Sequence, residues 1–205
     1  MKKSLLKNFL KRITLTVIIF GLVTMTVFGM YYFVEKKVVY PLSYEREVLI
    51  YSDTFSLDPF LVFSVIKIES GFDENALSNK GAKGLMQIIE PTAKFIAEAL
   101  DVKNYDLYDA DTNIRFGCYY LRYLLDRFEI QNTALCAYNA GEGNVNDWLS
   151  ENSLSKDGKN LDYIPFKETR EYIKKFEKTL SKYKKLYGKL LDKQKNIEYY
   201  NKATM

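Results

Sequence analysis

The sequence predicts an all-α protein in which a single N-terminal transmembrane helix precedes a folded helical domain. An uncharged run covers residues 13–34, and only 4 prolines occur among 205 residues. Later segments repeat their apolar residues at helical spacing, with little of the alternation that is typical of strands. Apolar residues make up 47% of the chain and charged residues 27%, which is normal for a globular domain. The length suits one domain plus a small additional segment.

The first element is the uncharged run from Ile13 to Val34, which holds 22 residues. As a helix it is roughly 33 Å long, enough to cross a membrane. Residues 1–34 carry five basic side chains and no acid, which predicts a cytoplasmic N-terminus and an extracytoplasmic domain in a single-pass protein of the cell membrane. A cleaved signal peptide is the alternative, but its apolar core is shorter, about 7–15 residues. An uncleaved anchor is therefore favoured.

Composition and residue spacing also predict how the rest of the chain is divided into segments. Pro41 and Ser43 indicate a linker between the membrane helix and the domain. The predicted organisation is a cytoplasmic tail at 1–12, the transmembrane helix at 13–34, a linker at 35–45, the domain at 46–188 and a weakly structured tail at 189–205.

One helix of the domain has clear end signals. Asp58 can cap its N-terminus, Pro59 fits the first turn, and Gly71 follows its end. Because apolar residues lie on nearly every face, this helix is expected to be buried. Further helices are predicted at 92–100, 113–128, 133–138 and 168–189.

Composition excludes several kinds of active site. The chain has no histidine and 2 cysteines, so histidine-dependent triads and His- or Cys-rich zinc sites are ruled out. No metal motif, phosphate loop or dinucleotide fingerprint is present, so no cofactor is expected. The net charge of +4 comes from the N-terminal cluster, and we therefore expect no nucleic-acid partner. Lysines near the C-terminus leave a weak alternative, contact with anionic wall polymers.

Glu69 is the clearest candidate for a residue that takes part in a chemical reaction. It is a carboxylate in the last turn of an otherwise apolar helix. Burial and the negative end of the helix dipole both favour its protonated form. A carboxylic acid that keeps its proton near neutral pH can act as a general acid on a sugar oxygen. From this helix alone, an exposed glutamate at a helix end is the favoured interpretation.

The segments that follow resemble the soluble lytic murein transglycosylases. The resemblance covers about residues 46–180 and rests on four motifs in the family's order. These are Glu69-Ser70-Gly71-Phe72 with Gly81-Ala82-Lys83-Gly84-Leu85-Met86-Gln87, then Asn113-Ile114 with Gly117 and Tyr120-Leu121, then Ala137-Tyr138-Asn139-Ala140-Gly141, and finally Ile164-Pro165-Phe166-Lys167-Glu168-Thr169-Arg170.

The resemblance implies a lysozyme-like helical domain that acts on the glycan strands of peptidoglycan. Glu69 matches the family's single catalytic acid and base, which cleaves the β-1,4 bond between N-acetylmuramic acid and N-acetylglucosamine and leaves a 1,6-anhydro end. Substrate-binding roles are implied for six further residues: Ser78, Met86, Gln87, Tyr138, Asn139 and Glu168. Glu168 matches an acidic position thought to support the tyrosine.

Two positions depart from the family pattern. Glu90 stands where proline is common, with Pro91 one residue later, and Glu142 replaces a frequent proline between two glycines. Neither change predicts loss of activity. The alternatives are a muramidase similar to goose-type lysozymes and a non-catalytic peptidoglycan-binding module of an envelope complex. Cys118 and Cys136 are compatible with a disulfide or with two buried thiols.

Overall fold

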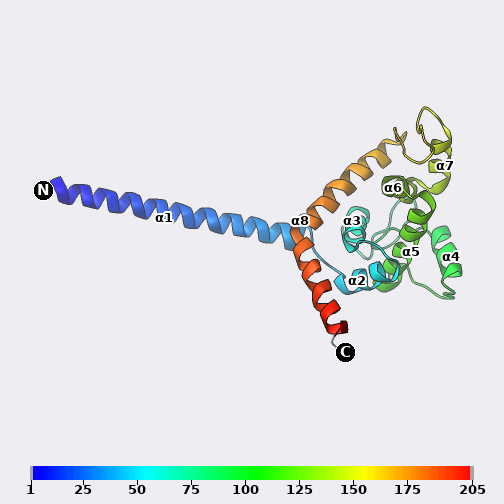
Figure 1. Cartoon of the computed structure of the whole chain (residues 1–205), viewed down its shortest axis with the longest axis horizontal. Helices are drawn as coiled ribbons and strands as arrows, with labels where there is room; N and C mark the ends of the chain where they lie inside the picture. Colours follow the sequence, from blue (N-terminus) through cyan, green and yellow to red (C-terminus); the bar gives the residue numbers. More distant parts are fainter. Residues whose placement is uncertain (1, 204–205) are drawn as a thin grey trace. The chain divides into compact units, whose positions relative to one another are not determined.

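The computed structural model describes the backbone of residues 2–203 and the side chains of residues 7–189. The chain divides into two units, residues 1–41 and 42–205. In the described part of the chain every regular element is a helix, so the predicted all-α class is confirmed. Figure 1 labels these helices.

The first unit consists of α1, Lys2–Val34, and a π-helical turn at Glu35–Val39. The helical stretch Lys7–Val39 is long and apolar enough to cross a membrane by length and composition, and its most apolar part is not buried. Four threonine hydroxyls donate hydrogen bonds to carbonyls one turn earlier in α1, which satisfies them inside the helix as an apolar surrounding requires. These are Thr14, Thr16, Thr24 and Thr26.

The second unit is a bundle of helices joined by irregular segments. Its helices, as described, are α2 (Glu45–Thr54), α3 (Pro59–Glu69), α4 (Glu90–Ala99), α5 (Ala110–Phe128), α6 (Gln131–Ala140), α7 (Glu142–Ser150) and α8 (Lys167–Ala203). The longest irregular segments are residues 70–89 and 151–166, and the first of them directly follows α3.

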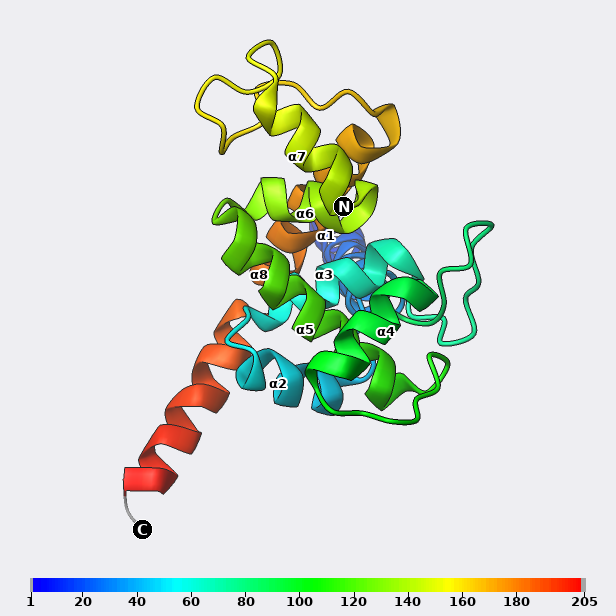
Figure 2. The same ribbon diagram turned by 90° about the vertical axis from the view of Figure 1, so that its right-hand side faces the viewer.

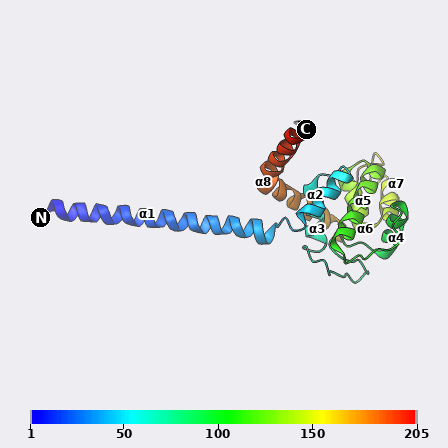
Figure 3. The ribbon, with the colours of Figure 1, turned by 90° about the horizontal axis from the view of Figure 1, so that it is seen from below.

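Helix α3 forms the centre of the bundle. Its residues from Pro59 to Ile66 are all buried, as the apolar pattern predicts. The Asp58 side chain accepts a hydrogen bond from the Phe60 amide at 2.9 Å, so the predicted N-cap is present. Helix α3 packs against α2 and α8, and Figures 1 and 3 show it beside both.

The helices differ from the prediction in three places. No helix was predicted at α2, and none at α7, which begins at Glu142, directly after Gly141. Helix α8 continues to Ala203, although a weakly structured tail was expected from residue 189. After Gly188 the sequence holds no glycine or proline, so helix formers can extend the last helix.

The two cysteines are buried and free. Cys118 lies on α5 and Cys136 on α6, and no disulfide joins them. Burial raises the pKa of the Cys136 thiol to about 12, and it also raises that of Cys118. Both thiols therefore stay protonated and act as small apolar core groups.

Candidate active site

Glu69 is the last residue of α3, and the segment that follows it is fixed to the fold. The Ser70 amide donates to Ile66 O at 3.1 Å, which closes the helix end. The Ser70 hydroxyl donates to Leu85 O at 2.9 Å, which ties this end to a later part of the irregular segment. Gly71 has a φ of 63°, the left-handed conformation that commonly ends a helix. The backbone that follows Glu69 is therefore held in place by hydrogen bonds.

The environment of Glu69 favours its neutral form. Its pKa is raised from 4.5 to about 7, chiefly because burial removes water from the carboxylate. The negative charge of Glu168 raises the pKa further, whereas the Tyr172 hydroxyl lowers it. The residue as a whole nevertheless keeps partial exposure. At neutral pH a substantial fraction of the protein therefore holds a protonated Glu69.

Tyr172 is a site residue that the sequence interpretation missed. It lies in the second turn of α8, exposes 6% of its surface, and interacts with Glu69. Its hydroxyl is a buried atom without a hydrogen-bond partner of good geometry. In the sequence, Tyr172 is one of the apolar residues that repeat at helical spacing in the predicted helix 168–189. The available signal was the hydroxyl itself, because a buried tyrosine normally needs a polar partner.

Asn113 fixes the segment opposite the end of α3. It is fully buried on α5, and its Oδ1 accepts a hydrogen bond from the Met86 amide at 2.7 Å. Its Nδ2 donates to Lys83 O at 2.9 Å and to Leu107 O at 2.7 Å. Both polar atoms of the Asn113 side chain therefore bind backbone groups that lie outside any helix or sheet. The sequence showed Asn113 only as a matching motif residue, without this role.

Two glycines allow the segment to approach α5 closely. Gly84 has a φ of 72°, and a Cβ atom there would lie 2.3 Å from Leu107 O. A Cβ atom on Gly117 would lie 2.2 Å from the Met86 sulfur. Larger residues at either position would force the backbone or Met86 to move.

Met86 joins this segment to α6. Its side chain is fully buried, and its carbonyl accepts a hydrogen bond from the Tyr138 hydroxyl at 2.7 Å. Burial, together with the charge of Glu69, raises the pKa of Tyr138 well above its usual value, so this tyrosine keeps its proton. Helices α3, α5 and α6 thus converge on one short stretch of backbone. The structure brings together Glu69, Met86 and Tyr138, three of the predicted site residues.

Ser78 and Gln87 stabilise the same irregular segment. The Ser78 hydroxyl oxygen accepts hydrogen bonds from the amides of Ala82 at 3.0 Å and Lys80 at 3.3 Å. The Gln87 side-chain nitrogen donates to Gly84 O at 2.9 Å and to Ala76 O at 3.2 Å. Both residues are partly exposed. These bonds use the Ser78 oxygen and the Gln87 nitrogen, and they leave the serine hydrogen and the amide oxygen for a ligand.

The remaining two predicted residues lie where α6 meets the start of α8. The Asn139 Oδ1 accepts a hydrogen bond from the Thr169 hydroxyl at 2.8 Å. Glu168 is 74% exposed, and its carboxylate lies 3.6 Å from the Lys80 ammonium group. The Tyr138 hydroxyl, which Glu168 is expected to support, donates its hydrogen bond to the Met86 carbonyl.

Residues able to bind a metal do not gather here. Among the described residues no group of three or more Cys, Asp or Glu side chains is placed to hold an ion. The chemistry that this arrangement can perform is proton transfer by Glu69.

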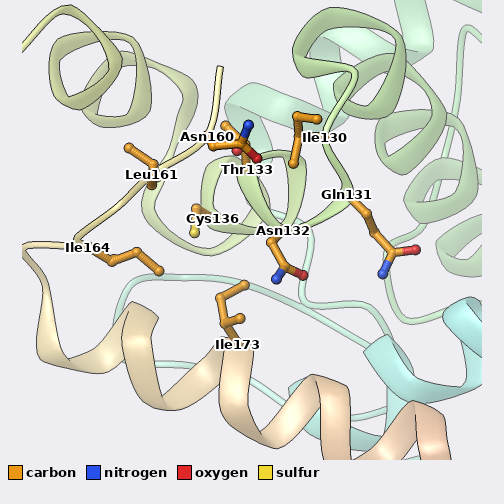
Figure 4. A pocket seen from close by; sticks show the side chains of 9 residues that line it. All are labelled: Ile130, Gln131, Asn132, Thr133, Cys136, Asn160, Leu161, Ile164 and Ile173. Atoms are coloured by element: carbon orange, nitrogen blue, oxygen red, sulfur yellow. The ribbon is translucent and has the colours of Figure 1, made fainter. Parts of the chain in front are cut away.

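A separate cavity of about 360 Å³ lies between the start of α6, the loop before α8, and α8 itself. Figure 4 shows Ile173 of α8 pointing toward it, with Cys136 and Thr133 on the α6 side. Ile173 follows Tyr172 directly in the chain, but Glu69 does not line this cavity.

Comparison with known proteins agrees with the predicted resemblance. The family model described as "Transglycosylase SLT domain" matches residues 48–161, more than half of the chain. The soluble lytic murein transglycosylase of Escherichia coli K12 is 32% identical over 141 residues, covering 66% of this chain and 22% of the relative. The membrane-bound lytic murein transglycosylase F of Shewanella denitrificans is 35% identical over 86 residues, covering 38% of this chain and 16% of the relative.

A solved structure is also similar. The lytic transglycosylase Slt of Pseudomonas aeruginosa, solved as an inactive mutant in which glutamine replaces a glutamate, matches with a TM-score of 0.62 and 28% identity. The match covers 72% of this chain and 25% of that chain. It confirms the predicted helical fold of the lysozyme-like type. The chain spans a quarter or less of the length of these relatives.

Proposed function

The chain belongs to the transglycosylase SLT family, and from this premise we propose that it is a lytic transglycosylase that cleaves the glycan strands of peptidoglycan. The observation that carries the proposal is the position of Glu69, a carboxylate at the end of the buried helix α3 beside Tyr138 and Met86, where desolvation raises its pKa to about 7. A group with this pKa is present in both protonation states at neutral pH. It can therefore serve first as an acid and then as a base.

The proposed reaction uses Glu69 as the only acid and base. Its proton goes to the oxygen of the β-1,4 bond between N-acetylmuramic acid and N-acetylglucosamine, and the bond from that oxygen to the muramic C1 breaks. The carboxylate then takes the proton of the muramic C6 hydroxyl, whose oxygen bonds to C1. The product is a 1,6-anhydro end, formed without water, and Glu69 regains its proton. Hydrolysis by lysozyme-type enzymes instead usually uses two carboxylates.

The neighbouring residues would bind and orient the sugar. The Ser78 hydroxyl hydrogen and the Gln87 amide oxygen are available to hydroxyl or acetamido groups of the strand. Met86 and Tyr138 would form the wall beside the acid. Asn139 and Glu168 would line the far side of the groove, where the charge of Glu168 also helps Glu69 to keep its proton.

We also propose that α1 anchors the enzyme in the cell membrane as a single span, with residues 1–12 in the cytoplasm and the second unit outside. The five basic residues in the first third of α1 support this orientation, because positive charge is retained on the cytoplasmic side. A relative named as membrane-bound is consistent with such a location. A full-length protein in the membrane fraction, with the second unit open to external protease, is expected. Release of a shortened, soluble protein would instead identify a cleaved signal sequence.

The activity is tested with purified peptidoglycan and three proteins: the full chain, Glu69→Gln, and Glu98→Gln. Glu98 is an exposed carboxylate of α4 and serves as the matched control. Loss of a general acid lowers the rate by about 10²–10⁴, so we expect that loss for Glu69→Gln and full activity for the control. Products resolved by mass should carry anhydro ends, which are one water lighter than reducing ends.

Other outcomes would identify the alternatives. Reducing muramic ends would identify a muramidase. Binding to peptidoglycan without any released product would identify a non-catalytic binding module. Undiminished cleavage by Glu69→Gln would show that another residue carries the reaction.

A further inference from the structure

Six aromatic side chains form a continuous row that leads away from the candidate active site. We call them the aromatic ridge: Phe55, Tyr119, Phe95, Tyr123, Tyr120 and Tyr138. Successive rings in this order have centroids 5.8, 6.4, 5.1, 6.1 and 5.5 Å apart. The ridge begins at Tyr138, next to Met86, and ends at the residue that follows α2.

The ridge lies on the surface of the domain. Its members come from α4, α5, α6 and the end of α2, and Figure 2 shows α2, α4 and α5 side by side on one face. Core aromatics such as Phe63 and Phe116 are almost completely buried. Phe95 in contrast exposes 41% of its surface, and the other members of the ridge are partly exposed. The rings of this row therefore keep some contact with solvent, which the core aromatics lack.

Polar groups border the ridge on the side of α7. The Glu142 carboxylate accepts a hydrogen bond from the Tyr123 hydroxyl at 3.1 Å and lies 3.1 Å from Arg127 Nε. The Tyr120 hydroxyl lies 3.5 Å from the same carboxylate. Glu142 thus holds two rings of the ridge in place. It occupies the position where the family frequently has proline.

We propose that the aromatic ridge is an additional binding surface for the glycan strand, at a distance from the bond that is cleaved. A sugar ring has an apolar face and a rim of hydroxyl groups, and this surface offers aromatic faces bordered by a carboxylate, a guanidinium and phenol hydroxyls. The ridge is continuous with the site through the contact between Tyr120 and Tyr138. A strand held at Glu69 can therefore extend onto it. The inference rests on the proposed function, because it takes the same strand as its ligand.

The test compares long glycan strands with a short tetrasaccharide fragment. Phe95→Ala removes the exposed centre of the ridge and leaves Glu69 and its neighbours intact. We expect KM for long strands to rise about two- to tenfold, as loss of one aromatic contact predicts, with kcat unchanged. Cleavage of the tetrasaccharide should not change, and Phe95→Tyr should restore wild-type values. Ile50→Ala, an exposed apolar residue of α2 outside the ridge, is the control and should match wild type.

A binding measurement keeps the inference testable independently of catalysis. In full chains carrying Glu69→Gln, the affinity for long glycan strands is measured with and without Phe95→Ala. A two- to tenfold loss of affinity supports the ridge even if no cleavage is detected, in which case only the proposed function fails. Equal affinity of the two proteins, or equal loss for long and short ligands, would overturn the ridge as an additional binding surface.

Discussion

Replacing the candidate acid is expected to stabilise the fold. In Glu69→Gln the side chain keeps its shape but cannot become charged. Burial raises the pKa of Glu69 from 4.5 to about 7, and this difference corresponds to a destabilisation of about 3 kcal/mol when the group is ionised. The variant avoids this loss. For a domain of this size, 3 kcal/mol corresponds to a rise in Tm of roughly 6–12 °C.

The gain should depend on pH in a defined way. Below pH 4.5 Glu69 is protonated in both the folded and the unfolded chain, so wild type and variant differ little. Between pH 4.5 and about 7 the folded state holds a proton that the unfolded state has lost, and wild-type stability falls as pH rises. Above about pH 7 the full difference is present. The stability advantage of Glu69→Gln should therefore grow from near zero at pH 4 to about 3 kcal/mol at pH 8.

The assay is reversible unfolding of the full chain in detergent, followed by near-ultraviolet circular dichroism from pH 4 to 8. Glu98→Gln, which changes an exposed carboxylate, should follow wild type at every pH. A constant difference between Glu69→Gln and wild type over this range would refute the reasoning. It would mean that the Glu69 carboxylate is not desolvated in the folded protein.

Three further predictions follow from the same contacts. Asn113→Ala leaves the Met86 amide and the Leu107 carbonyl without a partner, whereas the Lys83 carbonyl keeps its bond from the Ile88 amide. The change should cost roughly 2–6 kcal/mol in denaturant unfolding; a loss below 1 kcal/mol would contradict its clamping role. Gly84→Ala places a Cβ against Leu107 O and should cost about 2–3 kcal/mol, whereas an unchanged midpoint would show that the segment moves freely. Tyr172→Phe removes the hydroxyl that lowers the pKa of Glu69, so the decline of activity above pH 7 should shift to higher pH. An unshifted pH profile would show that the Tyr172 hydroxyl does not influence the protonation of Glu69.

The fold was largely predictable because its strongest signals are local. The Asp58-Pro59 start, the apolar faces of α3 and the spacing along α5 determine helices without reference to the rest of the chain. Helix α7 was missed because two glycines close together, Gly141 and Gly143, are typical of a loop. In the structure Gly141, with a φ of 89°, lies just before the helix, and Gly143 lies in its first turn. Tertiary packing overrides propensity at such positions.

The sequence pointed to the candidate acid but not to the residues that support it. Glu69 was singled out because a carboxylate in an apolar helix is unusual, and the resemblance then matched it to the family's acid. The partners that fix its surroundings, Asn113 and Tyr172, come from helices that lie 44 and 103 residues further along the chain. No local pattern links them to Glu69. Their hydrogen-bonding groups gain meaning only when α5 and α8 are packed beside α3.

The contacts of Met86 restrict how the domain can move. Its amide is held by α5, its carbonyl by α6, and its side chain fills the space above Gly117. The loop that carries it has no regular structure, yet it cannot open without disturbing two helices at once. Its amide should exchange with solvent as slowly as those of the helical core, so the backbone beside Glu69 would loosen only when the whole domain unfolds.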